Sequence, residues 1–192
     1  NIPSAGFIGL TNTIRRDSEG NVIFTGLFEG ELDFDPNPDE TFMLTADSGY
    51  ATFFQKLNAD GDLIWATRVS NILGNDVFLD DELNIFLTGK FSGESDFDSG
   101  PDEFLLDSEG VSSSFVLKLE SDGSFSWVKA FIGDETGRCE HIESDLSGNI
   151  ICSGMYAGVI DADPGPEIFE LTSNGSHDHF FIKLDESGEL LW

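Results

Sequence analysis

Alternation of apolar and polar residues runs through most of the chain and is typical of β-strands. In the middle of the chain the alternating segments are Asp76–Asp80, Asn84–Phe91, Glu103–Asp107, Ser114–Glu120 and Ser124–Phe131. Turn residues such as Asp-Gly and Ser-Gly separate these segments at intervals of about 8–12 residues, which predicts antiparallel meanders. No window shows a convincing helical period. The pattern therefore predicts an all-β protein.

The same order of segments occurs three times. Each copy ends in a similar phrase, FFQKLNADGDLIW (Phe53–Trp65), FVLKLESDGSFSW (Phe115–Trp127) or FFIKLDESGELLW (Phe180–Trp192). We expect repeats at residues 1–69, 70–131 and 132–192, the last with a truncated outer strand. About four strands per copy, repeated in tandem, predict the four-stranded antiparallel blades of a β-propeller. A β-sandwich or a β-solenoid is the alternative.

These phrases resemble the propeller repeats of bacterial secreted and surface proteins, often called seven-bladed propeller repeats. The first copy carries the resemblance on Asp17, Gly20, Asn21, Gly26, Phe53, Lys56, Leu57, Gly61 and Trp65. The second copy departs from it at Glu82 and Leu83, where the Ser-Gly pair is lost. The D-P-G-P stretch of the third copy resembles a subgroup found in large extracellular bacterial proteins. The resemblance implies a propeller fold and an extracellular or cell-surface location, and it implies no particular chemistry.

Charge limits the choice of partners. Thirty-seven Asp and Glu residues face nine Lys and Arg residues, a formal net charge of −28. Such a surface repels nucleic acid phosphates and anionic membranes, and it attracts divalent cations or basic proteins. The longest apolar stretches are too short to span a membrane. We therefore expect neither nucleic acid binding nor membrane insertion.

An acidic loop recurs in every copy, as DFDPNPDE, DFDSGPDE and DADPGPEI. Its D-x-D-x-x-x-[DE] skeleton consists of Asp33, Asp35 and Asp39; Asp96, Asp98 and Asp102; and Asp161, Asp163 and Glu167. Calcium takes six to eight oxygen ligands, which closely spaced carboxylates and backbone carbonyls can supply. These nine residues are candidate Ca²⁺ ligands. The alternative is that the aspartates cap turns through their own backbone, and the EF-hand positions for Gly and Glu are not met.

Other chemistry-bearing residues favour structural roles. Lys56, Lys118 and Lys183 share one repeat position, which predicts a structural ion pair rather than a catalytic group. His141, His177 and His179 occur in the third copy alone, and the H-D-H stretch is expected at a solvated strand end. No nucleophile triad, phosphate loop or zinc spacing is present. Scattered carboxylates leave a glycan hydrolase or lyase as the competing function.

The tryptophans and cysteines are also expected to have structural roles. Trp65 and Trp127 recur among apolar neighbours and are predicted to be core residues between blades. Cys139 and Cys152 are the two cysteines. A hairpin that turns at Leu146–Gly148 would not place them directly opposite each other, so the sequence favours free thiols over a disulfide.

Together these observations predict a non-catalytic, adhesion-type scaffold or binding segment that is extracellular and stabilised by calcium. Its expected partners are a protein or glycan at a cell surface, or further blades or copies of the same parent chain. A closed ring generally takes four to eight blades, so three repeats are expected to belong to a longer polypeptide or to pair with further copies. We also expect residues 1–10 to precede the first blade strand.

Overall fold

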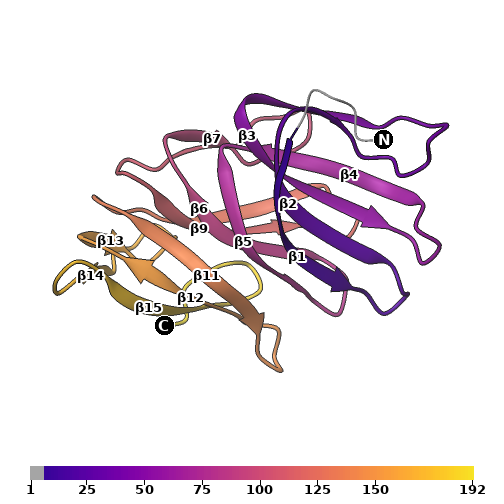
Figure 1. Cartoon of the computed structure of the whole chain (residues 1–192). Helices are drawn as coiled ribbons and strands as arrows, with labels where there is room; N and C mark the ends of the chain where they lie inside the picture. The colour runs from indigo at the N-terminus through magenta and orange to yellow at the C-terminus, as the bar shows by residue number, and fades with distance from the viewer. Residues whose placement is uncertain (1–6) are drawn as a thin grey trace.

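The computed structural model of the chain describes the backbone of residues 7–192 and the side chains of all of these except 7–12, 47 and 48. Within this range it contains strands and turns and no helix. Accordingly, the described residues include no helix with the length and apolar character needed to cross a membrane. Three antiparallel sheets follow one another in chain order (Figure 1).

The first sheet has four strands that pair in sequence order, β1-β2-β3-β4. They are β1 (Phe7–Arg16), β2 (Val22–Asp33), β3 (Met43–Leu57) and β4 (Leu63–Ser70). The turn after β1 lets Arg16 pair with Val22, and the turn after β3 lets Leu57 pair with Leu63. Each strand therefore hydrogen bonds to the one that precedes it, as in a simple meander.

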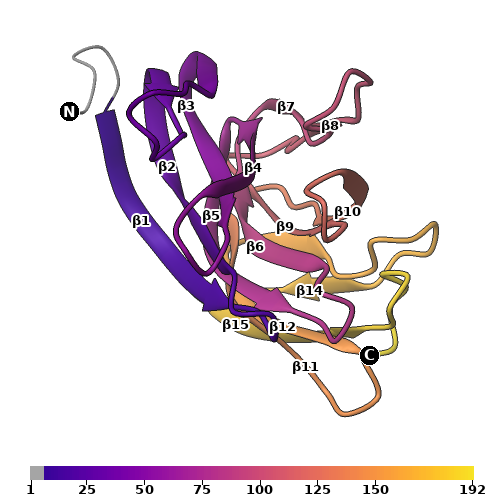
Figure 2. The same ribbon diagram turned by 90° about the vertical axis from the view of Figure 1, so that its right-hand side faces the viewer.

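The second sheet repeats this meander and adds a small ribbon. Its strands are β5 (Ile72–Leu79), β6 (Ile85–Phe91), β9 (Ser113–Leu119) and β10 (Phe125–Phe131). Between β6 and β9, the ribbon pairs β7 (Glu94–Asp96) with β8 (Leu105–Asp107). Figure 2 shows this ribbon projecting beyond the sheet. In the first repeat the equivalent ribbon is continuous with the ends of β2 and β3, where Asp33 pairs with Met43.

The third sheet has three full strands. They are β11 (Gly137–Ser144), β12 (Ile150–Tyr156) and β15 (Asp178–Leu184). A ribbon of β13 (Val159–Asp161) and β14 (Glu170–Thr172) lies between β12 and β15 in the chain. Where the other sheets have a fourth strand, this one has a single bridge between Leu184 and Leu190.

Most predicted strands of the second repeat are observed within one or two residues, and the differences have local causes. β5 begins at Ile72 rather than Asp76, because Gly74 and Asn75 do not end the strand but form part of a bulge. β1 begins at Phe7, so residues 7–10 belong to the first blade strand, contrary to the prediction. Residues 1–6 of that prediction lie outside the described residues.

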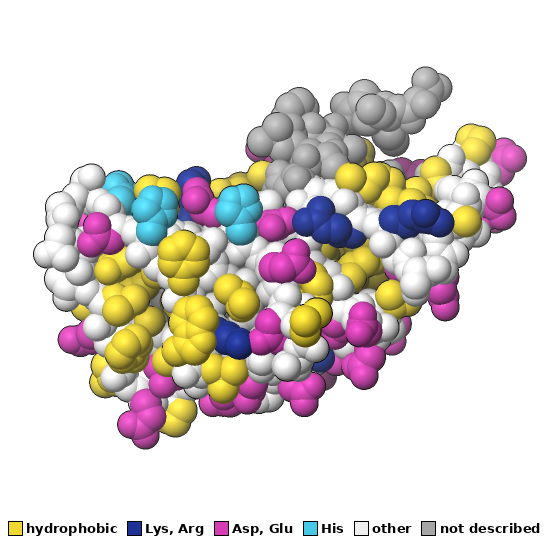
Figure 3. All heavy atoms as spheres, turned by 90° about the horizontal axis from the view of Figure 1, so that it is seen from below, with side chains coloured by type: hydrophobic (Ala, Val, Ile, Leu, Met, Phe, Trp, Pro, Cys, Tyr) yellow, Lys and Arg dark blue, Asp and Glu magenta, His cyan; other side chains and the backbone are white. Residues whose placement is uncertain are grey.

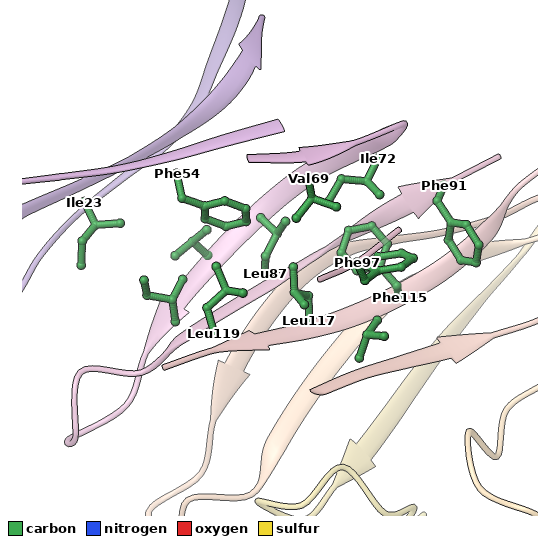
Figure 4. Packing of buried hydrophobic residues seen from close by; sticks show 13 residues of the cluster. Ile23, Phe54, Val69, Ile72, Leu87, Phe91, Phe97, Phe115, Leu117 and Leu119 are labelled. Carbon is green, nitrogen blue, oxygen red and sulfur yellow. The ribbon is translucent and has the colours of Figure 1, made fainter. Parts of the chain in front are cut away.

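Consecutive sheets pack face to face through apolar clusters. One cluster joins Ile23, Phe54 and Val69 of the first sheet to residues of the second such as Leu87 and Phe115 (Figure 4). A second cluster joins Phe86, Val116 and Phe131 of the second sheet to residues of the third. Each sheet is built from consecutive strands of one repeat and is covered by the next repeat. This is the organisation of stacked blades rather than of a β-sandwich or a β-solenoid.

The tryptophans are less buried than predicted. Trp65 and Trp127 are half-buried at the rim of their sheets, and each packs against a core cluster. The indole Nε1 of Trp65 donates to the carbonyl oxygen of Ser121, 3.3 Å away in a turn of the second sheet. That turn has Gly123 beneath the ring, where an added Cβ would lie 3.0 Å from Trp65 Cε3. The tryptophan therefore joins two blades and is not enclosed by its own.

Candidate functional site

The acidic loops lie at the same end of the second strand in each repeat. Alternation in the D-F-D and D-A-D stretches directs the middle residue inward and the two aspartates outward. Phe34 and Phe97 are buried, and Ala162 occupies the same position in the third repeat. The ring of Phe97 lies 5.2 Å from those of Phe91 and Phe115 in edge contacts. The buried residue anchors the loop to the core, a role that the sequence analysis did not assign.

The first aspartate of each loop closes it through backbone hydrogen bonds. Asp33 Oδ1 accepts from the amides of Asp35 and Phe42, at 3.0 and 2.9 Å. Asp96 Oδ1 and Asp161 Oδ1 accept in the same way from the amides two and eight residues later, at 2.8–3.1 Å. One oxygen of this carboxylate is therefore occupied by the ends of its own loop.

The second aspartate forms a turn of its own. Asp35 Oδ1 accepts from the amide of Asn37 at 2.8 Å, and Asp98 and Asp163 accept from Gly100 and Gly165 at 2.7 and 2.8 Å. These are turns in which an aspartate side chain substitutes for a backbone acceptor. The alternative considered from the sequence, capping by aspartate, accounts for both of these positions in all three repeats.

The third acid does not join the other two. Asp39, Asp102 and Glu167 are exposed, whereas the first two aspartates of each loop are half-buried. Among the described residues, no three His, Cys, Asp or Glu side chains form a group that could hold a metal ion. The structure thus brings the first two predicted ligands of each loop into linked turns and leaves the third in solvent.

Two of the acidic loops border open grooves. A groove of about 640 Å³ lies between the loop of the second repeat and the first sheet, lined on one side by Glu94, Asp96 and Asp98 and on the other by Arg68 and Met43. A groove of about 580 Å³ beside the third loop is lined by Asp134, Asp161 and Glu170 among others. In both grooves, acidic residues therefore outnumber basic ones.

Two carboxylates in a further pocket are also turn caps. This pocket, of about 400 Å³, contains Asp80, Asp145 and Glu186 together with Lys118. Asp80 Oδ1 accepts from the amides of Glu82 and Asn84, and Asp17 and Asp145 make the same pair of bonds in their own repeats. Acids that recur in every repeat with identical backbone partners serve the fold. Asp80 and Asp145 are therefore repeat positions and not a pair of carboxylates unique to this pocket.

The lysine position forms the predicted ion pair in two repeats. Lys56 Nζ lies 3.2 Å from Asp17, and Lys183 Nζ lies 2.6 Å from Asp145. Lys118, at the same position in the second repeat, lies over the ring of Phe86, 5.4 Å from its centroid. The side-chain hydrogen bonds from Asn149 and Lys183 hold the pKa of Asp145 well below its usual range.

The first strand of each sheet, β1, β5 or β11, contributes to a polar contact that joins all three repeats. Arg15 Nη2 of β1 lies 2.8 Å from Asp76 Oδ1 of β5. The other oxygen of Asp76 lies 3.7 Å from His141 Nδ1 of β11 and accepts from the amide of Ile142 at 3.3 Å. This His position is a contact between blades, whereas His177 and His179 are exposed at a strand end, as predicted.

Comparison with known proteins supports the repeat architecture. No family model matches the chain. The chain is 25% identical to an uncharacterized WD repeat-containing protein of Acanthamoeba polyphaga mimivirus, over 155 residues that cover 75% of this chain and 11% of that protein. The chain consists of β-propeller-type repeats. It spans about a tenth of the length of the relative that it matches.

Within these β-propeller repeats, the sequence pattern indicated the acidic loops and the tryptophans between blades but not the polar contacts between blades. Arg15, Asp76 and His141 lie in three different repeats, and no pattern along the chain indicates that they meet. The contact between Trp65 and the turn of the next blade could have been suspected from the sequence, because each repeat has both a tryptophan and a Ser-Asp-Gly type of turn at fixed positions. The geometry of this contact could be seen only once the sheets were stacked in the structure.

Proposed function

We propose that this β-propeller segment is a scaffold that acts by binding protein surfaces, and that the outer face of its third sheet is a docking surface. The observation that carries the proposal is Phe181, which is 66% exposed. Phe54 and Val116 occupy the same position in the first and second repeats and are 0% exposed, because the next sheet covers them. The third sheet presents the same apolar position to solvent.

Neighbouring residues extend this apolar face. Trp192 is 58% exposed and Leu191 is 49% exposed, whereas Trp65, at the position of Trp192, contacts the next blade. Figure 3 shows hydrophobic side chains gathered toward the end of the molecule that carries the third sheet. At the opposite end of the stack, Phe34 of the acidic loop packs against Phe28 and Phe53, with ring centroids 5.2 and 4.9 Å apart. At this end, therefore, these three phenylalanines are buried, whereas Phe181 of the third sheet is exposed.

A sheet of the same kind fits this face best. The two internal interfaces show what such a face accepts, namely the leucine, isoleucine and phenylalanine side chains of a following blade. We propose that another copy of the chain can supply this surface in solution. The WD repeat relative is much longer than this chain, which is consistent with a larger array of blades.

Light scattering and sedimentation of the purified chain test the docking surface. Phe181→Asp places a charge on the face, so we expect concentration-dependent association of the original chain and a monomeric variant. Phe169→Asp is the matched control, because Phe169 is 52% exposed on the acidic loop of the third repeat and off this face. A chain that remains monomeric at high concentration, or a Phe181→Asp variant that associates like the control, would contradict the proposal.

We propose an extracellular or cell-surface setting for this scaffold, of the adhesion type found with bacterial surface-protein propeller repeats. The support is the sequence resemblance and the net charge of −28, a charge whose self-repulsion is screened in salty surroundings. A glycan at a cell surface is the other partner that this setting allows. Catalysis is the weaker candidate, because the carboxylates that line the pocket at Asp80 and Asp145 cap turns.

We also propose that calcium stabilises the acidic loops. Each loop offers two aspartates with one oxygen engaged by backbone amides, so an ion in a single loop would draw further oxygens from backbone carbonyls and water. The support is that Asp33, Asp96 and Asp161 share one geometry in three copies, as repeated ligands would.

A further inference from the structure

Two cysteine sulfurs lie together in the interior of the third sheet. Cys139 in β11 is 0% exposed and Cys152 in β12 is 1% exposed. Their Sγ atoms are 3.5 Å apart, with the Cys139 thiol donating to the Cys152 sulfur, and both are free thiols. The two residues are not directly opposite, because Cys139 pairs with Gly154 and Cys152 pairs with Ile142.

Gly154 explains how residues that are not opposite can meet. It has no side chain to fill the space across from Cys139, and a Cβ there would overlap the carbonyl oxygen of Arg138. A bulge follows directly, between Cys139 and His141. The Cys139 side chain can therefore extend along the sheet toward Cys152, two residues from Gly154 on the same face of β12.

The second repeat shows that these two positions are in contact without sulfur. Gly74 pairs with Gly89 as Cys139 pairs with Gly154, and a Cβ added at Gly74 would lie 2.8 Å from Leu87 Cδ1. Leu87 is the counterpart of Cys152. A glycine and a leucine thus fill the space that two thiols fill in the third repeat, so the fold does not need sulfur here.

We propose that Cys139 and Cys152 form a dithiol modification site that closes into a cross-strand disulfide when an external disulfide oxidant reaches it. A disulfide needs an S–S distance of about 2.05 Å, so the sulfurs must approach from 3.5 Å. Rotation of the two side chains within one face of the sheet can supply this approach. The inference is independent of the docking surface and of calcium.

The reaction with oxidised glutathione balances in two steps. One cysteine thiolate attacks the glutathione S–S bond, forms a mixed disulfide and releases one glutathione thiolate, which takes up a proton. The second cysteine, as its thiolate, then attacks the protein sulfur of the mixed disulfide and releases the second glutathione. Overall, two protein thiols lose two electrons and two protons, and one glutathione disulfide becomes two thiols.

Burial of the two thiols limits the rate of this reaction. The hydrogen bond with Cys139, together with burial, raises the pKa of the Cys152 thiol well above its ordinary value. The thiolate is the attacking species, so the folded pair reacts slowly at neutral pH. Oxidation therefore proceeds when β11 and β12 separate, or before the sheet has formed.

The test is a redox titration of the whole chain in glutathione buffers, followed by unfolding and counting of free thiols. We expect the unfolded, acid-quenched product to contain no free thiol and its intact mass to be lower by two hydrogens. A link between neighbouring strands also constrains the unfolded chain, so the melting temperature should rise by about 5–10 °C on oxidation. Both changes should reverse with a reducing agent.

Cys152→Ala, which removes one sulfur and adds no atom beside Cys139, is the matched control. It should fold, keep one free thiol and show no rise in melting temperature under the same buffers. Two free thiols after treatment of the original chain, a lasting glutathione adduct, or disulfides only between chains would each overturn the proposal.

Discussion

Aspartate side chains perform one recurring task in this chain, at the scale of single residues. Asp17, Asp80 and Asp145 each accept from the amides two and four residues later, with oxygen–nitrogen distances of 2.8–3.0 Å. These bonds fix the turn between the first two strands of each repeat. At these three positions the acidic residue is thus explained by turn geometry.

Asp17 shows the energetic consequence most clearly. Its side chain is 0% exposed and that of its partner Lys56 is 7% exposed. Burial raises the pKa of Asp17, but hydrogen bonds from Asn21 and Lys56 outweigh it, so the pKa lies below the ordinary value. A lowered pKa means that folding favours the charged carboxylate. This stabilisation is complete above the unfolded pKa of about 3.9 and is lost as pH falls through the folded pKa.

Asp17→Asn is therefore expected to destabilise the chain at neutral pH by about 2–3 kcal/mol, because it leaves the Lys56 ammonium buried without its counter-ion. Below about pH 4 the difference from the original chain should shrink, since Asp17 itself becomes protonated. Urea unfolding across pH measures both effects. Asp60→Asn, at an exposed turn position, is the control and should change little. A pH-independent difference would show that the carboxylate charge is not responsible.

Among the loops and strands, the acidic loop is the element that recurs with the same contacts in all three repeats. A buried phenylalanine or alanine fixes its start, and aspartates close it through backbone bonds. The loop is therefore ordered by protein contacts, and its half-buried aspartates, Asp96, Asp98 and Asp161, border two grooves.

Calcium is expected to raise the melting temperature of the chain relative to a chelator at matched ionic strength. A ligand that binds only the folded state stabilises it by RT ln(1 + [L]/Kd), about 2.7 kcal/mol at a hundredfold excess over Kd. Matched ionic strength matters because the net charge of −28 makes any salt stabilising. Identical melting curves in calcium and chelator would contradict the prediction.

The double variant Asp33→Asn with Asp35→Asn locates the ion. If three equivalent loops bind calcium, this variant should lose about a third of the bound ion in metal analysis. Glu19→Gln is the control, because Glu19 is an exposed acid outside the acidic loops. An equal loss of calcium in both variants would point to diffuse attraction by the acidic surface.

At the scale of the whole molecule, the main contacts are those between stacked sheets. Apolar clusters, the Trp65 contact and the polar contacts that link Arg15, Asp76 and His141 all cross from one repeat to the next. Since each blade is covered by its neighbour, stability depends on interfaces as much as on individual sheets.

Trp65→Ala tests this coupling. Full burial of a tryptophan would make truncation cost about 3–5 kcal/mol, but Trp65 is half-buried, so we expect about 2–3 kcal/mol. Leu146→Ala is the control, since Leu146 is fully exposed at a turn and should contribute little. Denaturant unfolding compares the two variants. Equal midpoints for both would show that the indole of Trp65 does not hold the blades together.

The sequence alone determined the repeat, the strand type and most strand positions. Period-two alternation and Asp-Gly or Ser-Gly turns depend on residues that are close in the chain, so they can be recognised from the sequence without a structure. The D-x-D spacing likewise offered two roles for the acidic-loop aspartates, calcium binding and turn capping. The capping role was visible from the sequence because the backbone partners lie only two to nine residues away.

Only the tertiary structure decided which distant groups meet. Side chains separated by a whole repeat, such as Arg15 and Asp76, come together because sheets stack, and stacking depends on the packing of many apolar residues at once. Cys139 reaches Cys152 because a glycine leaves room opposite it. Phe54 and Phe181 have the same local sequence, yet one is buried and the other exposed, because burial depends on whether a neighbouring sheet covers the face.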